Sequence, residues 1–144
     1  MKAAGGRTPS FSQNPDIIKV REAMVQMMAQ AAAAGPPPDY RGVKASNIGI
    51  PVRDGSTMNA VVYQPGSSPA GGNPLVLLFH AGGFCMGVAQ MMEPLGLELV
   101  KNHGTTVLSL DYRLAPEHPF PVAIEDSYDA LKWVHQSLLL RHPF

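Results

Sequence analysis

Residues 74–84 read PLVLLFHAGGF, a short apolar run that is followed directly by a glycine-rich turn. An unbroken apolar run bounded by turn residues is typical of a strand covered on both faces, as in a parallel sheet. Glycines at the carboxyl end of such a strand let backbone N–H groups face a crevice, where they bind developing negative charge. A Gly-Gly pair by itself would equally suit a tight turn that needs glycine for steric reasons. The stretch therefore predicts an α/β fold and marks where a site would lie.

Strand and helix patterns continue on both sides of this stretch. Apolar residues alternate with polar ones around the turn signal Asp54-Gly55, which predicts a β-hairpin over residues 43–65. The remaining expected elements, in chain order, are a helix over Met91–Asn102, a second buried strand over Thr105–Leu110 and a helix over Val122–Leu140. On the last helix, Asp126 and Asp129 are expected on the wetter faces. Buried strand, helix, buried strand and helix in this order predict a parallel crossover and the α/β class.

The N-terminal segment differs from the rest in composition. Residues 1–13 lack periodicity and are expected to form a loose leader. Asn14 is placed to cap a helix over Pro15–Ala34, which should end at the Gly-Pro-Pro-Pro run that follows it. The methionines of this helix recur at helical spacing, which favours ordinary packing over a lid above an apolar ligand. We therefore expect a cap-type helix and linker over residues 14–38, followed by a partial α/β domain over residues 39–144.

Composition excludes several classes of partner and site. Eleven basic residues balance eleven acidic residues, so charge gives no argument for binding nucleic acid or an anionic membrane surface. The lone cysteine, Cys85, excludes an internal disulfide framework and a Cys-x-x-Cys zinc site, and it suits a reducing compartment. The first ten residues lack the apolar core of a signal peptide, and the run at residues 75–79 is too short to span a bilayer. A cytoplasmic protein without membrane insertion is expected.

A second motif follows the second predicted strand. Residues 111–121 read DYRLAPEHPFP, and together with HAGGF at residues 80–84 they resemble the hormone-sensitive-lipase branch of the α/β-hydrolases, whose members carry HGGGF and DYRLAPE. The resemblance extends over about residues 43–134 and includes the segment EDSYDALKWV at residues 125–134. It implies the N-terminal half of an α/β-hydrolase fold, truncated before the nucleophile elbow, and descent from a carboxylic ester hydrolase.

The glycine loop is where the resemblance places catalysis. In the family, the second and third glycines of the first motif supply backbone N–H donors to the oxyanion of a tetrahedral intermediate, and this role passes to Gly82 and Gly83. The resemblance gives His80 the role of bracing the loop, not that of the catalytic base, and makes Phe84 part of the same support. The sequence departs from the motif at Ala81. This substitution is tolerable if φ is negative there, whereas a left-handed backbone would cost about 1 kcal/mol.

The polar residues of the second motif are expected to be architectural. By the resemblance they tie strand, turn and neighbouring helix together: Asp111, Tyr112, Arg113 and Glu117. Arg113 and Glu117 should be at least partly buried and paired, because unpaired buried charges are costly. The same turn reverses sharply and is rich in proline, so at least one of the bonds Ala115-Pro116 and Phe120-Pro121 should be cis.

The residues that attack an ester are missing from this pattern. None of the nine serines has glycine on both sides at Gly-x-Ser-x-Gly spacing, and the nearest approach, GSSPA at residues 66–70, lies in a Pro- and Gly-rich linker. A nucleophilic Cys85 paired with a histidine is an alternative, although buried cysteines that act as small apolar residues are far commoner. The five histidines show no zinc-binding spacing on one helical face, so no metal and no cofactor are expected.

These observations leave three functions open. The first is a truncated carboxylic ester hydrolase that keeps the oxyanion loop, lacks the Ser/Asp/His triad and is inactive alone. The second is a non-catalytic module that binds a small anion or acyl ligand or assembles through its half-sheet, and the third is a half-enzyme that a separate chain completes. In the fold implied by the resemblance, Leu75–Phe79 lies beside the nucleophile strand and should present an unpaired edge. Self-association or a partner chain is expected there unless the helix over Pro15–Ala34 folds across it.

Overall fold

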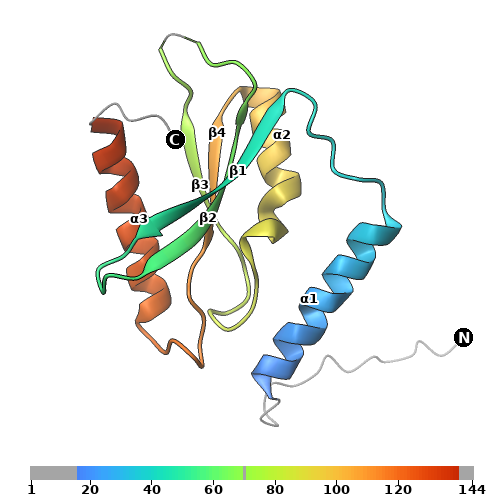
Figure 1. Ribbon diagram of the computed structural model, residues 1–144, viewed down its shortest axis with the longest axis vertical. Helices are drawn as coiled ribbons and strands as arrows, with labels where there is room; N and C mark the ends of the chain where they lie inside the picture. Colours follow the sequence, from blue (N-terminus) through green and yellow to red (C-terminus); the bar gives the residue numbers. More distant parts are fainter. Residues whose placement is uncertain (1–15, 70, 140–144) are drawn as a thin grey trace, which may run out of the picture.

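The computed structural model describes residues 16–69 and 71–139, which form a mixed sheet with helices on both faces (Figure 1). The elements, in chain order, are α1 Ile17–Ala34, β1 Val43–Pro51, β2 Thr57–Pro65, β3 Leu75–Phe79, the 3₁₀ turn η2 Ala89–Met92, α2 Glu93–His103, β4 Thr106–Asp111 and α3 Val122–Leu139. The predicted α/β class is confirmed, and each predicted strand and helix is present with ends that shift by one to a few residues.

The four strands lie in the order β1-β2-β4-β3. β1 and β2 form the predicted antiparallel hairpin, with Val43 opposite Pro65, and β2 is antiparallel to β4. β3 is parallel to β4, with Phe79 opposite Leu110, and α2 connects the two strands. Because parallel strands end at the same edge of a sheet, the loop after β3 and the turn after β4 are neighbours in space.

Two apolar cores lie on opposite faces of the sheet, one under α3 and one under α2. β4 shows how they arise, because alternate side chains point to opposite faces: Leu108 and Leu110 join the core under α3, whereas Val107 joins the core under α2. From the helices, Ala130 and Val134 of α3 enter one core and Leu97 of α2 enters the other. Both faces of β4 are therefore buried, which explains its unbroken apolar sequence.

α1 stands outside both cores. It begins at Ile17 and is capped by the side chain of Asp16, which replaces the expected cap. Residues 1–15, which hold the expected leader and the expected cap Asn14, lie outside the described residues. None of the residues of α1 is buried, and Met27 is 69% exposed. The methionine stripe, for which ordinary packing was favoured, joins neither core: Met24 and Met28 are half-buried.

β3 forms one edge of the sheet. In the described part of the chain it pairs with β4 alone, and three of its five residues are only partly buried. Phe79, at its end, is exposed. Figure 1 shows α1 on the α2 side of the molecule, away from β3, so this helix does not fold across the edge. The sheet therefore offers backbone donors and acceptors that the described residues leave unpaired.

Candidate functional site

The loop that follows β3 contains a run of residues with positive φ. Gly82, Gly83 and Phe84 have φ values of 142°, 60° and 62°. Other residues enter this region at a cost of about 1–3 kcal/mol, whereas glycine enters it freely. A Cβ on Gly82 would lie 2.0 Å from the carbonyl oxygen of Met86, so that position accepts only glycine. Ala81 has no positive φ and thus meets the condition under which alanine fits the loop.

The first glycines of this loop keep free backbone donors. The carbonyl oxygen of Gly82 accepts hydrogen bonds from the N–H groups of Cys85 (3.1 Å) and Met86 (3.0 Å), which closes a tight turn. Within residues 16–69 and 71–139, the N–H groups of Gly82 and Gly83 have no acceptor. Both glycines line a pocket of about 450 Å³ together with Ile17, Cys85 and Met86. Two unpaired donors therefore border an open pocket at the carboxyl end of a parallel strand.

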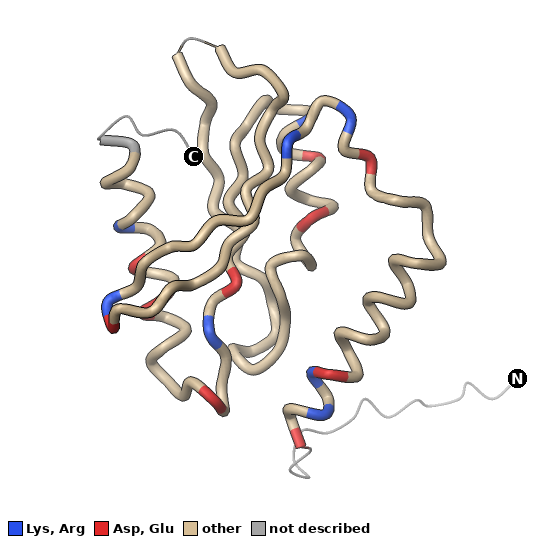
Figure 2. Tube along the Cα trace, viewed as in Figure 1, with Lys and Arg blue, Asp and Glu red and all other residues tan. Residues whose placement is uncertain are grey.

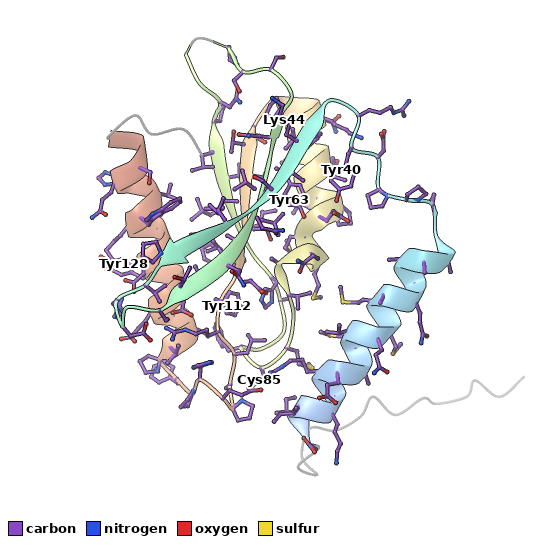
Figure 3. All side chains as sticks on the ribbon, in the orientation of Figure 1. Tyr40, Lys44, Tyr63, Cys85, Tyr112 and Tyr128 are labelled. Atoms are coloured by element: carbon purple, nitrogen blue, oxygen red, sulfur yellow. The ribbon has the colours of Figure 1, made fainter. Side chains whose placement is uncertain are left out.

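His80 and Tyr112 support the loop from beneath, and Figure 3 shows Tyr112 between the sheet and the segment that carries Cys85. The His80 ring is buried and stacks on the Tyr112 ring, with centroids 4.2 Å apart. The Tyr112 hydroxyl donates to the carbonyl oxygen of His80 at 2.6 Å, and Nδ1 of His80 lies 3.0 Å from the carbonyl oxygen of Ala81. Burial raises the pKa of Tyr112, so the hydroxyl stays a donor at neutral pH.

Gly87 is a member of the site that the sequence reasoning missed. Its φ is 106°, and a Cβ there would lie 2.1 Å from Nδ1 of His80. The next turn is tied to β4, because the Asp111 carboxylate accepts from the N–H of Ala89 at 3.1 Å and the Ser109 hydroxyl donates to the Ala89 carbonyl oxygen at 2.8 Å. Asp111 thus holds the far end of the loop. The one available signal was a third glycine shortly after the HAGGF stretch.

Arg113 holds α3 to the hairpin turn and to the segment after β4. Its Nε and terminal nitrogen lie 2.9 Å and 2.7 Å from the Asp126 carboxylate, which also accepts from the Arg113 backbone N–H. The other terminal nitrogen lies 2.6 Å from Asp54. Hydrogen bonds from Ser56 and then Arg113 hold the pKa of Asp54 well below its usual range. Asp126 is buried, so its expected place on a wetter face is wrong: the guanidinium compensates for the water it loses.

A second arginine repeats this arrangement one turn further along α3. Arg53 donates through Nε, a terminal nitrogen and its backbone N–H to the Asp129 carboxylate at 2.9–3.0 Å, and to Glu125 at 2.8 Å. Asp129 is also buried, and the prediction of a wetter face is wrong for it as well. The hydrogen bonds from Arg53 hold its pKa well below the usual range. Figure 2 shows these opposite charges together where the hairpin turn meets α3.

Glu117 is paired across a much longer sequence distance than expected. Its two carboxylate oxygens lie 2.7 Å and 3.1 Å from the guanidinium of Arg21, on α1. The same guanidinium donates to the carbonyl oxygens of Cys85 at 2.9 Å and Ala115 at 2.6 Å. Glu117 is exposed, so its expected burial is wrong, although its pairing is present. The sequence reasoning did not single out Arg21, which lies outside both motifs.

The turn after β4 is bound to the glycine loop. The N–H of Ala115 donates to the carbonyl oxygen of Phe84 at 2.9 Å. The bonds Ala115-Pro116 and Phe120-Pro121 are both cis, which confirms the expectation that at least one would be. Loop and turn therefore meet directly at the edge where β3 and β4 end.

The cysteine and histidines do not form a second catalytic group in the described residues. Cys85 lines the pocket, and among these residues no hydrogen bond joins its thiol to a histidine. A group of three or more His, Cys, Asp or Glu side chains placed to hold a metal ion is also not found there. Of the helices in the described ranges, none is long and apolar enough to cross a membrane.

Comparisons with known proteins show what this chain is similar to. A protein family described as the alpha/beta hydrolase fold matches residues 76–141. The carboxylic ester hydrolase LipN of Mycobacterium tuberculosis is 38% identical over 94 residues, which are 65% of this chain and 24% of LipN. The 2-hydroxyisoflavanone dehydratase of Glycyrrhiza echinata is 32% identical over 124 residues, which are 83% of this chain and 38% of that protein.

A solved esterase structure has the same fold over most of this chain. The structure titled bacterial heroin esterase superposes with a TM-score of 0.76 at 29% identity, over 85% of this chain and 38% of the esterase. The chain therefore spans about a quarter to two fifths of the length of these relatives. The family match at residues 76–141 includes the glycine loop, α2 and β4.

Proposed function

Because this chain has the fold of the N-terminal part of an α/β-hydrolase and is related to carboxylesterases, we propose that it is the oxyanion-loop half of a carboxylic ester hydrolase of the hormone-sensitive-lipase type. In this proposal, the N–H groups of Gly82 and Gly83 bind the oxyanion of a tetrahedral intermediate. The nucleophile, general base and acid come from residues that do not belong to this 144-residue sequence, in which no serine has the Gly-x-Ser-x-Gly spacing. The chain alone is then inactive toward esters.

One observation carries the proposal: two backbone donors without acceptors border a pocket at the carboxyl end of a parallel strand. Ester cleavage places negative charge on one oxygen, and donors that are already in place stabilise this charge without reorganising. The φ values of Gly82 and Gly83 fix this arrangement in the backbone, and no side chain is required to supply it. A site of this kind lowers a barrier only when a nucleophile is present.

His80 supports the loop in this proposal and does not act as base. Its ring is buried against Tyr112, and its Nδ1 lies close to the carbonyl oxygen of Ala81. A general base must reach the proton that it removes, at about 2.6–3.2 Å in a plausible substrate pose. A ring enclosed between the loop and β4 is poorly placed for that role.

The first test is an assay of the purified chain with short p-nitrophenyl esters. We expect no turnover above a denatured control, because donors and binding alone leave only residual catalysis. Saturable turnover that a serine-directed phosphonate abolishes would contradict the proposal. Turnover that disappears in Cys85→Ser would instead support the cysteine alternative.

A second test supplies the missing part. The chain is fused in frame to the C-terminal portion of a related carboxylesterase, which carries its own nucleophile. Alanine keeps the backbone N–H, but its Cβ would lie 2.0 Å from the Met86 carbonyl oxygen and displace the loop. We expect Gly82→Ala to lower kcat by roughly 10²–10³, because misplacing an oxyanion donor should cost about as much as removing one. Gly71→Ala is the matched control, since a Cβ at Gly71 meets nothing within 4 Å. Equal activity of the two variants would contradict the role assigned to the loop.

A half-enzyme that a separate chain completes is the second candidate, and the open edge of β3 favours it. β3 is partly buried and has no proline or charged residue to discourage pairing. Native mass measurement separates the candidates: a stable monomer argues for a piece that needs no partner to fold, and a defined complex argues for assembly at this edge.

A further inference from the structure

Arg21 connects three segments that are far apart in the chain. From α1 it donates to the Cys85 carbonyl oxygen in the glycine loop, to the Ala115 carbonyl oxygen in the turn after β4, and to both oxygens of Glu117. Its side chain is only 19% exposed, although α1 itself has no buried residue. A planar guanidinium with several donors suits such a junction, whereas an ammonium group cannot reproduce its fork geometry.

The contacts of Arg21 fall where the loop is under backbone strain. Phe84 is the one non-glycine residue with positive φ in the described ranges. Such a conformation persists only when surrounding contacts hold it. Inside the loop, the Gly82 carbonyl oxygen closes the turn around Phe84. Two further hydrogen bonds tie the loop to other segments: the Phe84 carbonyl oxygen accepts from the N–H of Ala115, and the Cys85 carbonyl oxygen accepts from Arg21. Arg21 therefore fixes one of the two carbonyls through which the loop is held from outside.

The same helix also forms a wall of the pocket. Ile17 precedes Arg21 by one helical turn, so both lie on one face of α1. Ile17 lines the pocket with Gly82, Gly83 and Cys85. When Arg21 is bound to the loop, Ile17 is held beside the two free N–H groups.

We propose that Arg21 is a positioning residue that keeps residues 82–85 in their strained conformation and holds Ile17 as the wall that limits the size of the group bound beside Gly82 and Gly83. That the bound group is an acyl chain rests on the proposed function. The contacts of Arg21 and the place of Ile17 in the pocket wall are independent of the proposed function.

Cys85 provides the readout, because it is the only thiol in the chain and lies in the loop that Arg21 holds. The alkylation rate of the full chain by iodoacetamide is measured by mass spectrometry under native conditions. We expect Arg21→Gln to raise the rate roughly tenfold, since losing charge-assisted hydrogen bonds shifts a local opening equilibrium by about that factor. Arg21→Lys should raise it only about two- to fivefold, because lysine keeps the charge but not the fork.

The matched control is Arg41→Gln. This change also removes an arginine that pairs with a carboxylate, that of Asp39, at a distance from the loop. Its alkylation rate should equal that of the wild type, and the melting temperature of every variant is measured alongside. An unchanged rate in Arg21→Gln, or an equal rise in Arg41→Gln, would overturn the proposal. If Arg21→Gln does not fold, a wild-type rate in Arg21→Lys overturns it.

The wall is tested with a bulkier reagent, N-phenylmaleimide. In Ile17→Ala we expect the rate with this reagent, divided by the rate with iodoacetamide, to rise several-fold. Val25→Ala, an exposed residue of the same helix, should leave the ratio unchanged. An unchanged ratio in Ile17→Ala would show that Ile17 does not limit the size of the group that enters the pocket. Neither measurement involves an ester, so failure of the fusion assay and failure of this inference are separate results.

Discussion

The first and last helices of the described chain have the same length, 18 residues, but they are attached in opposite ways. α3 places Ala130 and Val134 in the core and accepts two arginine side chains at its buried carboxylates. α1 has no buried residue, and Figure 2 shows its charges confined to the beginning of the helix. There, Arg21 binds the loop and the turn.

The difference shows that an apolar period identifies a helix but not its packing partner. Both helices carry apolar residues at helical spacing. In α3, Ala130 and Val134 are buried against the sheet although Leu131 is exposed, whereas in α1 no residue is buried. Regions with few buried apolar contacts open at low free energy. We therefore expect α3 to unfold with the sheet and α1 to detach before it.

The largest expected effect comes from Asp126→Ala in α3. This change removes the acceptor of the Arg113 backbone N–H, Nε and one terminal nitrogen, although the other terminal nitrogen keeps Asp54. Breaking a buried ion pair of this kind costs about 3–5 kcal/mol in unfolding free energy. Denaturant unfolding measures this, with Met27→Ala of α1 as the comparison, which should change stability by no more than about 0.5 kcal/mol. Similar losses in both variants would remove the distinction between the two helices.

The second prediction concerns the open edge beneath α3. Leu77 of β3 is partly buried and packs against the core on that side. If copies of the chain pair along this edge, Leu77→Lys should shift the species seen by size exclusion with light scattering toward the monomer. A wild-type chain that is already a compact monomer with a cooperative thermal transition would contradict edge pairing. Loss of folding in Leu77→Lys would show that this side chain serves the core instead.

Acid should lower the unfolding free energy, by less than Asp126→Ala does, through a carboxylate of α3. Arg53 lowers the pKa of Asp129 in the folded chain below its unfolded value. The folded state therefore gains stability that is fully present above the usual carboxyl pKa of about 4 and is lost as the pH falls toward the folded pKa. Unfolding free energy should decline from pH 6 to pH 3, and less steeply in Asp129→Asn. An identical decline in that variant would exclude Asp129 as a source.

The smallest effect is expected on α1. Val25→Ser, at an exposed position, should leave the melting temperature within experimental error, because it removes no buried contact. A clear loss of stability would mean that α1 packs against the body more extensively than its exposure indicates. The comparison between the two helices would then need revision.

Much of the fold was predictable because it rests on local patterns. The alternation around Asp54-Gly55 gave the hairpin, and the apolar run at Leu75–Phe79 gave a parallel strand. Asp126 and Asp129 were misplaced because a carboxylate on a helix is normally solvated. Their partners lie 13 and 76 residues away, and no local pattern indicates them.

The candidate site, like the fold, was predictable where it rests on a local sequence motif. Gly82 and Gly83 belong to a recognisable motif, and their backbone conformation follows from residue type. Arg21 was not predictable, because its contacts depend on where α1 lies in space. Gly87 had a weak signal, since its requirement for glycine comes from the approach of His80.

The strand order β1-β2-β4-β3 also sets the order in which the chain acquires its structure. Asn59 pairs with Asp111, which closes a loop of roughly fifty residues, and non-local pairings of this kind slow folding. During synthesis the hairpin and β3 emerge from the ribosome before the strand that pairs with both of them. Until β4 is complete, these segments share no partner and expose apolar surface. We expect the nascent chain to be most prone to aggregation, and most dependent on chaperones, in the interval before residue 111 emerges.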